Sequence, residues 1–460
     1  MINIEQERGF LNVSYYDTDG EIVIKNIKLS NEQQFEWVDN TRSRDEHPIF
    51  KSWATKGPVS KKKGFFLSKA RQIEVLEQLP KDVQDEIYQF NIPKKSFVDI
   101  ETRVDGEWPN PAVARHEVTA ISYVIENELV VMGTKMLEPA KVKAIGMKIN
   151  EYVGKHGYEP YSFKFFYYKT EASMLLDFFA NQIKKMPLLT GWNFIGFDWT
   201  YLVNRAKRLD IDPSLASPVG KLVGRDNLPL HRVVVDYLEI YKKWDYGIFK
   251  ENNTLDYVAK TATGMGKIKF TGSFDELYDG NYAKYVYYNA IDSILVQLID
   301  KKLETMSIYL HLGDITKTPL DKVMSPIALT ENVLIREFLS RGLVVPLDKT
   351  IKKRGSYEGA YVFVPMPGLY EWVASFDFAS LYPSIMRQWN MSPETFIKEL
   401  HNNPGKVCKA ITGVFFDNEK DSGFRTILAN YYSQRKVAKK VMQESFHDAF
   451  LLKEFLKKVS

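Results

Sequence analysis

Four carboxylates and a tyrosine, spread over three segments, are the side chains of this sequence best suited to chemistry. Asp99 and Glu101 lie two residues apart in SFVDIET, Asp198 follows the apolar stretch of GWNFIGFDWTYLVNR, and Asp292 comes four residues after Tyr288 in YYNAIDSILVQLID. Hydrolysis of a phosphodiester by two divalent ions needs several hard oxygen ligands, an activated water and a group that orients this water. These five side chains are a sufficient set for that reaction.

Each segment taken alone also has a purely structural explanation. Asp99 and Glu101 share one face of a strand and repel each other unless a cation lies between them, but a solvated strand end would also accommodate them. Asp198 could simply cap the helix that it begins. Tyr288 and Asp292 share one face of a helix, as a half-buried tyrosine beside a surface aspartate would. The occurrence of all three segments in this order is what favours a metal site.

The elements expected around these segments alternate between strands and helices. The spacing of apolar residues predicts strands at 95–104, 116–133 (two, with a turn at Glu126 and Asn127), 187–194 and from 233, and helices at 171–186, 199–209 and 282–306. Such alternation is typical of an α/β domain. Outside it, we expect short strands and two helices separated near Pro80 before residue 92, helices across 306–348 and 431–460, and a strand at 371–379.

The composition is that of an ordinary globular protein. Of its residues 45% are hydrophobic and 26% charged, and the net charge is +4. Because the chain has 460 residues, two to four domains are expected. One cysteine, Cys408, excludes an intrachain disulfide and a cysteine-rich zinc site. Neither a signal peptide nor a membrane-spanning stretch is expected.

The three segments resemble the exonuclease motifs of family B DNA polymerases. DIE is similar to the first motif, NFIGFD to the second (N-x-x-x-F-D) and YNAID to the third (Y-x-x-x-D). The resemblance implies a ribonuclease-H-like 3′–5′ exonuclease in which two Mg²⁺ or Mn²⁺ ions are held by Asp99, Glu101, Asp198 and Asp292. It also implies that Tyr288 orients the water.

The same resemblance assigns residues to the DNA strand. Asn193 and Phe197 of the second motif would lie beside the terminal nucleotide. Lys267, in GMGKIKF, is similar to a family lysine near the scissile phosphate, although a solvated lysine is an equal alternative. The segment is no nucleotide-binding P-loop, because Ile268 stands where serine or threonine would follow the lysine.

SFDFASLYPSIMRQ is the most specific string in the chain, and it resembles motif A of the family B palm, D-x-x-S-L-Y-P-S. The resemblance implies that Asp377 is a metal carboxylate of a polymerase site and that Phe378 offers its carbonyl to an ion. Ser380 and Leu381 would hold triphosphate oxygens through their backbone N–H groups. Tyr382 would lie under the incoming sugar and exclude a ribose 2′-OH.

Two flanking segments extend this resemblance. SYEGAYV is similar to the family's Y-x-G-(G/A) segment, so Tyr357 and Gly359 would contact the template strand. YYSQRKVAKKVM resembles the start of the fingers, where Arg435, Lys436 and Lys439 on one helix would grip the triphosphate of a dNTP. A solvated basic helix face is the structural alternative.

Two further elements of the family, a fingers helix with K-x-x-x-N-S-x-Y-G and the palm motif D-T-D-S, are not found in the sequence. Asp377 alone cannot hold the two further ions of a polymerase site. We therefore expect a second polymerase chain that carries the rest of the fingers, the palm and the thumb, and through it a sliding clamp. A truncated form of one longer polymerase is the alternative to a naturally split enzyme.

The expected organisation is an N-terminal domain (1–92, with 306–348 packing on it), the exonuclease (93–305), a partial palm with motif A (349–421) and the first part of the fingers (422–460). Across about 93–445 the motifs look most like those of the replicative polymerases of T-even-type phages. The expected substrates are DNA primer-templates, single-stranded 3′ ends and, in the completed enzyme, dNTPs. The expected location is the cytoplasm of an infected host cell, with no attachment to a membrane. A stand-alone 3′–5′ exonuclease and a non-enzymatic nucleic-acid-binding platform are the alternatives.

Overall fold

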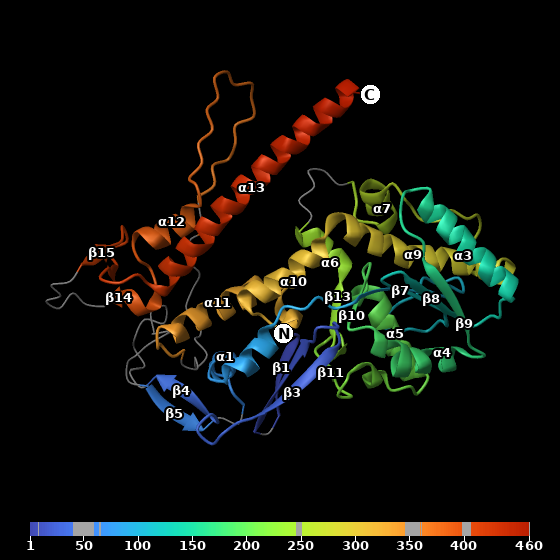
Figure 1. The fold of residues 1–460 in the computed structure, drawn as a ribbon, viewed down its shortest axis with the longest axis horizontal. Helices are drawn as coiled ribbons and strands as arrows, with labels where there is room; N and C mark the ends of the chain where they lie inside the picture. Colours follow the sequence, from blue (N-terminus) through green and yellow to red (C-terminus); the bar gives the residue numbers. More distant parts are fainter. Residues whose placement is uncertain are drawn as a thin grey trace. The chain divides into compact units, whose positions relative to one another are not determined.

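The computed structural model of the chain describes residues 1–7, 9–39, 59–63, 66–244, 251–345, 359, 361–397 and 406–459. They belong to two compact units, Met1–Lys28 with Leu79–Thr330 and Leu29–Gln78 with Glu331–Ser460. Both units mix helices and strands, so the predicted α/β class is confirmed (Figure 1). The four-part division made from the sequence stays a prediction.

A six-stranded mixed sheet, in the order β13-β10-β6-β7-β8-β9, is the centre of the first unit. Its strands are β6 (Lys95–Thr102), β7 (Val118–Ile125), β8 (Glu128–Gly133), β9 (Ser162–Tyr167), β10 (Leu188–Gly191) and β13 (Val233–Asp236). Strand β6 pairs antiparallel with β7 and parallel with β10, which pairs parallel with β13. The strands predicted around the carboxylate segments are confirmed, including the turn at Glu126, whose φ is 52°.

Helices cover both faces of this sheet, because its strands carry apolar side chains alternately on either side. Phe97 of β6 faces a core shared with α3 (Pro139–Gly154), α7 (Leu255–Thr263) and α9 (Tyr282–Leu303). Val98 and Ile100 face the opposite core, shared with α4 (Glu171–Asp177) and α5 (Thr200–Arg208). By the same alternation, Asp99 and Glu101 lie on the α9 side of the sheet.

The rest of the first unit surrounds this three-layer body. A second sheet has the order β1-β2-β3, and the Tyr16 hydroxyl on β2 donates a 3.1 Å hydrogen bond to the Pro187 carbonyl just before β10. The remaining elements are β1 (Asn3–Glu7), β2 (Phe10–Tyr16), β3 (Ile22–Lys28), α2 (Lys81–Tyr88), β11 (Leu222–Val223), β12 (Leu228–Pro229), α6 (Tyr237–Trp244), α8 (Phe274–Gly280) and α10 (Thr305–Thr316), with short helical turns η2 (Phe178–Gln182), η3 (Ile183–Lys185), η4 (Ile195–Trp199), η5 (Pro213–Ala216) and η6 (Leu320–Lys322).

The second unit has a smaller core, in which Ile73 packs with Ile335 and Phe338. Ile73 lies on α1 (Lys69–Glu77), and the other two lie on α11 (Pro326–Ser340), which begins in the first unit. The other elements are β4 (Phe35–Asp39) paired with β5 (Val59–Lys63), α12 (Leu381–Gln388), η7 (Pro393–Thr395), a sheet of β14 (Phe396–Ile397), β16 (Phe415–Asp417) and β15 (Val407–Lys409), and the long helix α13 (Gly423–Val459).

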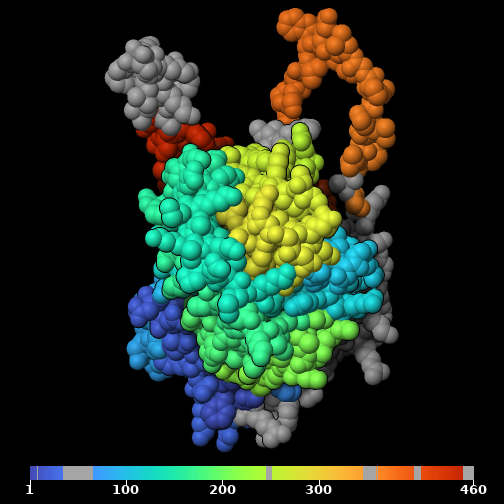
Figure 2. Space-filling model, turned by 90° about the vertical axis from the view of Figure 1, so that its right-hand side faces the viewer, coloured from blue at the N-terminus to red at the C-terminus, as the bar shows by residue number. Residues whose placement is uncertain are grey.

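The strand predicted at 371–379 is wrong for this structure. Residues 361–378 form neither helix nor strand, and their large side chains are exposed, with Leu369 98%, Trp372 96% and Phe376 93% accessible. In Figure 2 this segment, drawn in orange, is an arch of chain with no other residues packed between its arms. A strand needs a neighbour to share its backbone hydrogen bonds, and no described segment pairs with these residues.

One expectation concerns membranes. No helix in the described part of the chain combines the length and the hydropathy of a membrane span.

Candidate active site

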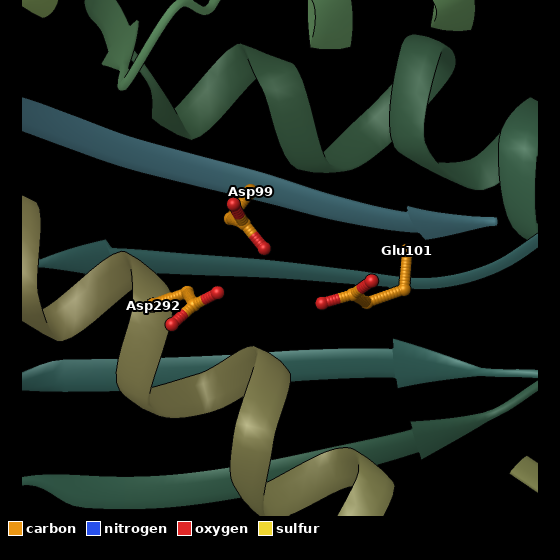
Figure 3. Close-up of side chains that lie close together, drawn as sticks. All are labelled: Asp99, Glu101 and Asp292. Atoms are coloured by element: carbon orange, nitrogen blue, oxygen red, sulfur yellow. The ribbon is translucent and has the colours of Figure 1, made fainter. Parts of the chain in front are cut away.

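Asp99, Glu101 and Asp292 meet between β6 and α9. Each offers a carboxylate oxygen, and the three oxygens lie within 4.8 Å of one another. Strand β6 supplies two of them because residues two apart share a face, and α9 crosses that face and supplies the third. Figure 3 shows the three carboxylates directed toward one another. The structure thus brings Asp292 to two residues that precede it by 191 and 193 positions in the sequence.

Asp198, which comes from the second of the three sequence segments, also contacts β6. It lies in η4, directly after β10, and is 5% exposed. Its Oδ1 accepts a 3.0 Å hydrogen bond from the Ile100 N–H on β6, whereas neither η4 nor the following α5 has a side-chain hydrogen bond at its N-cap. The Asp198 carboxylate therefore bonds to the strand and does not cap a helix. It is not one of the three carboxylates that approach within 4.8 Å, but its charge contributes to raising the pKa of Glu101.

These carboxyl groups hold negative charge poorly without a cation. Burial and the charge of Asp292 raise the pKa of Asp99 to about 8. Burial and neighbouring carboxylates likewise raise the pKa values of Glu101 and Asp198 well above their usual range. The Oδ1 of Asp292 is buried and has no hydrogen-bond partner among the described residues. A divalent cation would satisfy that oxygen and offset the repulsion, so the donor set fits Mg²⁺ or Mn²⁺.

Lys267 brings a positive charge to this cluster. Its Nζ lies 2.6 Å from Asp292 Oδ2 and donates a 3.3 Å hydrogen bond to the Tyr288 hydroxyl. Burial lowers the pKa of Lys267, but the charges of Asp292 and Tyr288 outweigh burial and raise it well above its usual value. Its backbone N–H donates to Asp256 at 2.8 Å, which fixes the loop that carries it. Lys267 is therefore in direct contact with one carboxylate of the cluster, that of Asp292.

Tyr288 is packed as well as hydrogen-bonded. It is 6% exposed, and its ring lies 5.5 Å from that of Phe270 and 5.3 Å from that of Phe274, both edge to face. This packing and the hydrogen bond from Lys267 together fix the position of the Tyr288 hydroxyl group beside Asp292.

Asn193 lies on the loop that joins β10 to η4, and Phe197 lies in η4 itself. Asn193 is exposed, has a positive φ of 58°, and accepts a 2.9 Å hydrogen bond at its carbonyl from the Phe197 N–H. Phe197 is half-buried, with its ring 5.6 Å from that of Tyr201. The Asp236 carboxylate at the end of β13 holds this loop by accepting a 3.1 Å hydrogen bond from the Ile195 N–H. The same turn therefore carries both residues and Asp198.

Asn289 was not singled out from the sequence. Its Nδ2 donates a 2.8 Å hydrogen bond to Asp99 Oδ2, and it is fully buried. It stands directly after Tyr288 and three residues before Asp292, so helical spacing already places it on the face turned to the cluster. The three-residue spacing of Asn289 and Asp292 in YNAID could therefore have identified Asn289 as a neighbour of the cluster.

The residues predicted to belong to a palm site are not gathered into a comparable site. Asp377 and Phe378 lie in the exposed irregular segment. Ser380, with a positive φ of 53°, precedes α12, whose first residues Leu381 and Tyr382 are 42% and 73% exposed. Asp377 belongs to no group of three potential metal ligands in the described part of the chain.

The remaining predicted residues are also at the surface of the second unit. Arg435, Lys436 and Lys439 lie exposed on α13, and the Lys436 Nζ is 4.7 Å from the ring centroid of Tyr432. Gly359 is exposed, and Tyr357 lies outside the described residues.

Comparison with known proteins gives two matches to one family. The sequence model described as DNA polymerase family B, exonuclease domain, matches residues 71–234, and that described as DNA polymerase family B matches residues 327–456. The first range contains Asp99, Glu101 and Asp198, and the second contains Asp377. Together the two ranges cover more than half of the chain.

Individual relatives agree with these matches. The DNA-directed DNA polymerases of Escherichia phage RB69 and Enterobacteria phage T4 are each 28% identical to the chain, over 78% and 81% of its length. The matched parts are 43% and 45% of those two proteins, so the chain spans less than half the length of these relatives. A DNA polymerase of Archaeoglobus fulgidus is 32% identical over 45% of the chain and 27% of its own length.

The fold and the matches agree. A mixed sheet with helices on both faces, carrying acidic residues on β6 and after β10, is the arrangement expected of a ribonuclease-H-like exonuclease, and the exonuclease-domain match includes those strands. The chain belongs to DNA polymerase family B and contains that family's exonuclease domain.

Proposed function

We propose that the carboxylate cluster degrades single-stranded DNA from its 3′ end and is the proofreading site of a replicative DNA polymerase. The observation that carries this proposal is the convergence of Asp99, Glu101 and Asp292 on one small space, with Lys267 in contact with the last of them. An anionic cleft repels DNA phosphates unless cations are bound, so a buried carboxylate cluster in a polymerase family favours metal-dependent hydrolysis over simple DNA binding.

Each side chain has a part in the proposed reaction. Asp99, Glu101, Asp198 and Asp292 hold two Mg²⁺ or Mn²⁺ ions, which when bound supply a hydroxide near neutral pH and stabilise the leaving 3′ oxygen. The Tyr288 hydroxyl accepts a hydrogen bond from the lysine and orients the attacking water.

The other groups act on the DNA strand. The Lys267 ammonium neutralises charge on the scissile phosphate, and Asn193 and Phe197 hold the terminal nucleotide. Because the strand is held by its backbone and by stacking, cleavage depends weakly on sequence.

We further propose that Asp377 is part of a polymerase site that a second polypeptide completes. That polypeptide supplies the missing carboxylate with the rest of the fingers, the palm and the thumb, and it binds the sliding clamp. The exposed aromatic side chains of 361–378 support this proposal, because such residues favour burial against a partner.

In the completed enzyme the motif A residues and the basic helix act on the incoming dNTP. Asp377 and the Phe378 carbonyl would hold two further Mg²⁺ ions together with the carboxylate of the second polypeptide. The remaining contacts are made to the triphosphate and sugar by Ser380, Leu381, Tyr382, Arg435, Lys436 and Lys439, and to the template by Tyr357 and Gly359.

The exonuclease proposal is tested with a single-stranded oligonucleotide labelled at its 5′ end. With Mg²⁺ or Mn²⁺ the chain alone should yield a ladder of products shortened from the 3′ end, and a chelator should stop it. An oligonucleotide that stays intact with either metal contradicts the proposal. Salt-sensitive DNA binding with no metal dependence would instead indicate a binding platform.

A further inference from the structure

Helix α9 presents a second polar row to the sheet beside the row of Tyr288 and Asp292. Tyr285, Asn289 and Ser293 follow one another at intervals of four residues, so they lie on successive turns of one helix face. Their exposed fractions are 1%, 0% and 0%. Polar side chains buried so completely need partners, and all three find them on β6 or β7.

The two ends of this row fasten α9 to the carboxylate strand and its neighbour. The Tyr285 hydroxyl bonds to Thr119 Oγ1, which donates a 3.0 Å hydrogen bond to the Glu101 carbonyl. Ser293 Oγ bonds to Ser122 Oγ, which donates at 2.9 Å to the Asn289 carbonyl. The helix is thus bonded to β7 on both sides of Asn289, and through Thr119 also to β6.

The orientation of the Asn289 amide follows from its partner. A carboxylate accepts hydrogen bonds, so the NH₂ group must face Asp99 Oδ2, from which it is 2.8 Å away. The amide oxygen then points elsewhere, and it is buried with no hydrogen-bond partner among the described residues. Burying a lone amide oxygen is unfavourable, and an apolar side chain of similar size would avoid that cost. The contact with Asp99 therefore accounts for an asparagine at this position better than core packing does.

We propose that Asn289 is a positioning residue, whose amide holds one oxygen of Asp99 so that the other stays directed at the cation shared with Glu101 and Asp292. This inference rests on the proposed exonuclease function. Neighbours that orient metal ligands typically change metal affinity when removed. A residue that only filled the core would change stability instead.

The test measures Mn²⁺ binding to the full chain, from the loss of the free-ion signal in electron paramagnetic resonance, and thermal unfolding of the same samples. Asn289→Leu keeps the size of the side chain and Asn289→Ala leaves a cavity, but both remove the N–H donor. Gln297→Leu is the matched control. Gln297 is a second buried amide on α9, 4% exposed, that donates to the Glu126 carbonyl and accepts from the Tyr161 hydroxyl.

Both Asn289 variants should bind Mn²⁺ about tenfold more weakly than the unmodified chain. Their affinities should be equal, although Asn289→Ala should unfold at a lower temperature than Asn289→Leu. Gln297→Leu should lose stability and keep its Mn²⁺ affinity. Unchanged affinity in both Asn289 variants overturns the inference, and so does a loss of affinity that follows the loss of stability across all three variants. If the unmodified chain neither binds Mn²⁺ nor shortens DNA, the proposed function itself fails, and this inference with it.

Discussion

The carboxylate cluster of Asp99, Glu101 and Asp292 and the segment around Asp377 carry the same kind of residue in opposite settings. Asp99 and Asp292 project from a strand and a helix that pack on each other, and each has a hydrogen-bonded neighbour, Asn289 or Lys267. Asp377 lies in an irregular segment among exposed aromatic side chains. The difference shows that a metal site is set by the elements behind its ligands, because ligands on a rigid scaffold need no reorganisation when the ion binds.

Under the proposed function, the contrast also separates the reaction that the chain would perform alone from the reaction that would require a second polypeptide. The carboxylate cluster of the first unit lies on a sheet that has a hydrophobic core on each face. The segment around Asp377 has no strand beside it in the described part of the chain. We therefore expect mutations to act on the two sites independently.

The largest effect should come from removing ligands of the first site. The double change Asp99→Ala and Glu101→Ala should reduce 3′–5′ degradation by more than about 100-fold, the upper range for mere neighbours of metal ligands. The rate of shortening of a 5′-labelled oligonucleotide measures it. Asp377→Ala is the control and should degrade DNA at the normal rate. Loss of degradation in that control, or its survival in the double variant, breaks the comparison.

The reverse pattern is expected for polymerisation. The chain alone should not extend a primer, and adding a polypeptide with the missing palm motif, fingers and thumb should allow extension. In that mixture Asp377→Ala should abolish extension, because it removes a metal ligand, while the double variant of the first site should still extend. Extension of a labelled primer by this chain without any partner would contradict the split arrangement.

The sequence predicted the first region well because its elements are locally encoded. Alternation placed Val98 and Ile100 in one core and Asp99 and Glu101 on the opposite face. The helix predicted at 282–306 is α9, which ends three residues earlier, at Leu303. The strand at 371–379 was predicted wrongly, since a strand also requires a partner and local propensity cannot supply one. Asn289 was overlooked for a related reason: its meaning depends on Asp99, 190 residues away.

A smaller effect is expected at Lys267. Lys267→Met should slow degradation by about tenfold to 100-fold, because hydrogen bonds to charged groups contribute about 1.5–3 kcal/mol. Lys269→Met, two residues further and exposed, is the matched control and should leave the rate unchanged. Rates at saturating Mg²⁺ compare the variants without a difference in metal occupancy. Equal rates for both variants would show that contact with Asp292 and Tyr288 is only structural.

The smallest effect should be seen in the stability of the isolated chain. Phe376 is 93% exposed, so Phe376→Ala should change the free energy of unfolding by less than about 0.5 kcal/mol. Phe179 is fully buried in the core behind β6, and Phe179→Ala should lower it by about 3–5 kcal/mol. Denaturant titration followed by circular dichroism measures both.

A loss of more than about 1 kcal/mol for Phe376→Ala would mean that the segment is packed in solution, and the contrast between the two regions would disappear. If the segment is instead a surface for the second chain, Phe376→Ala should weaken binding of that chain while leaving the isolated protein unchanged. Binding of the second chain would then depend on Phe376 and stability on Phe179. The reason is that Phe179 is already buried within the first unit, whereas Phe376 would become buried only on association.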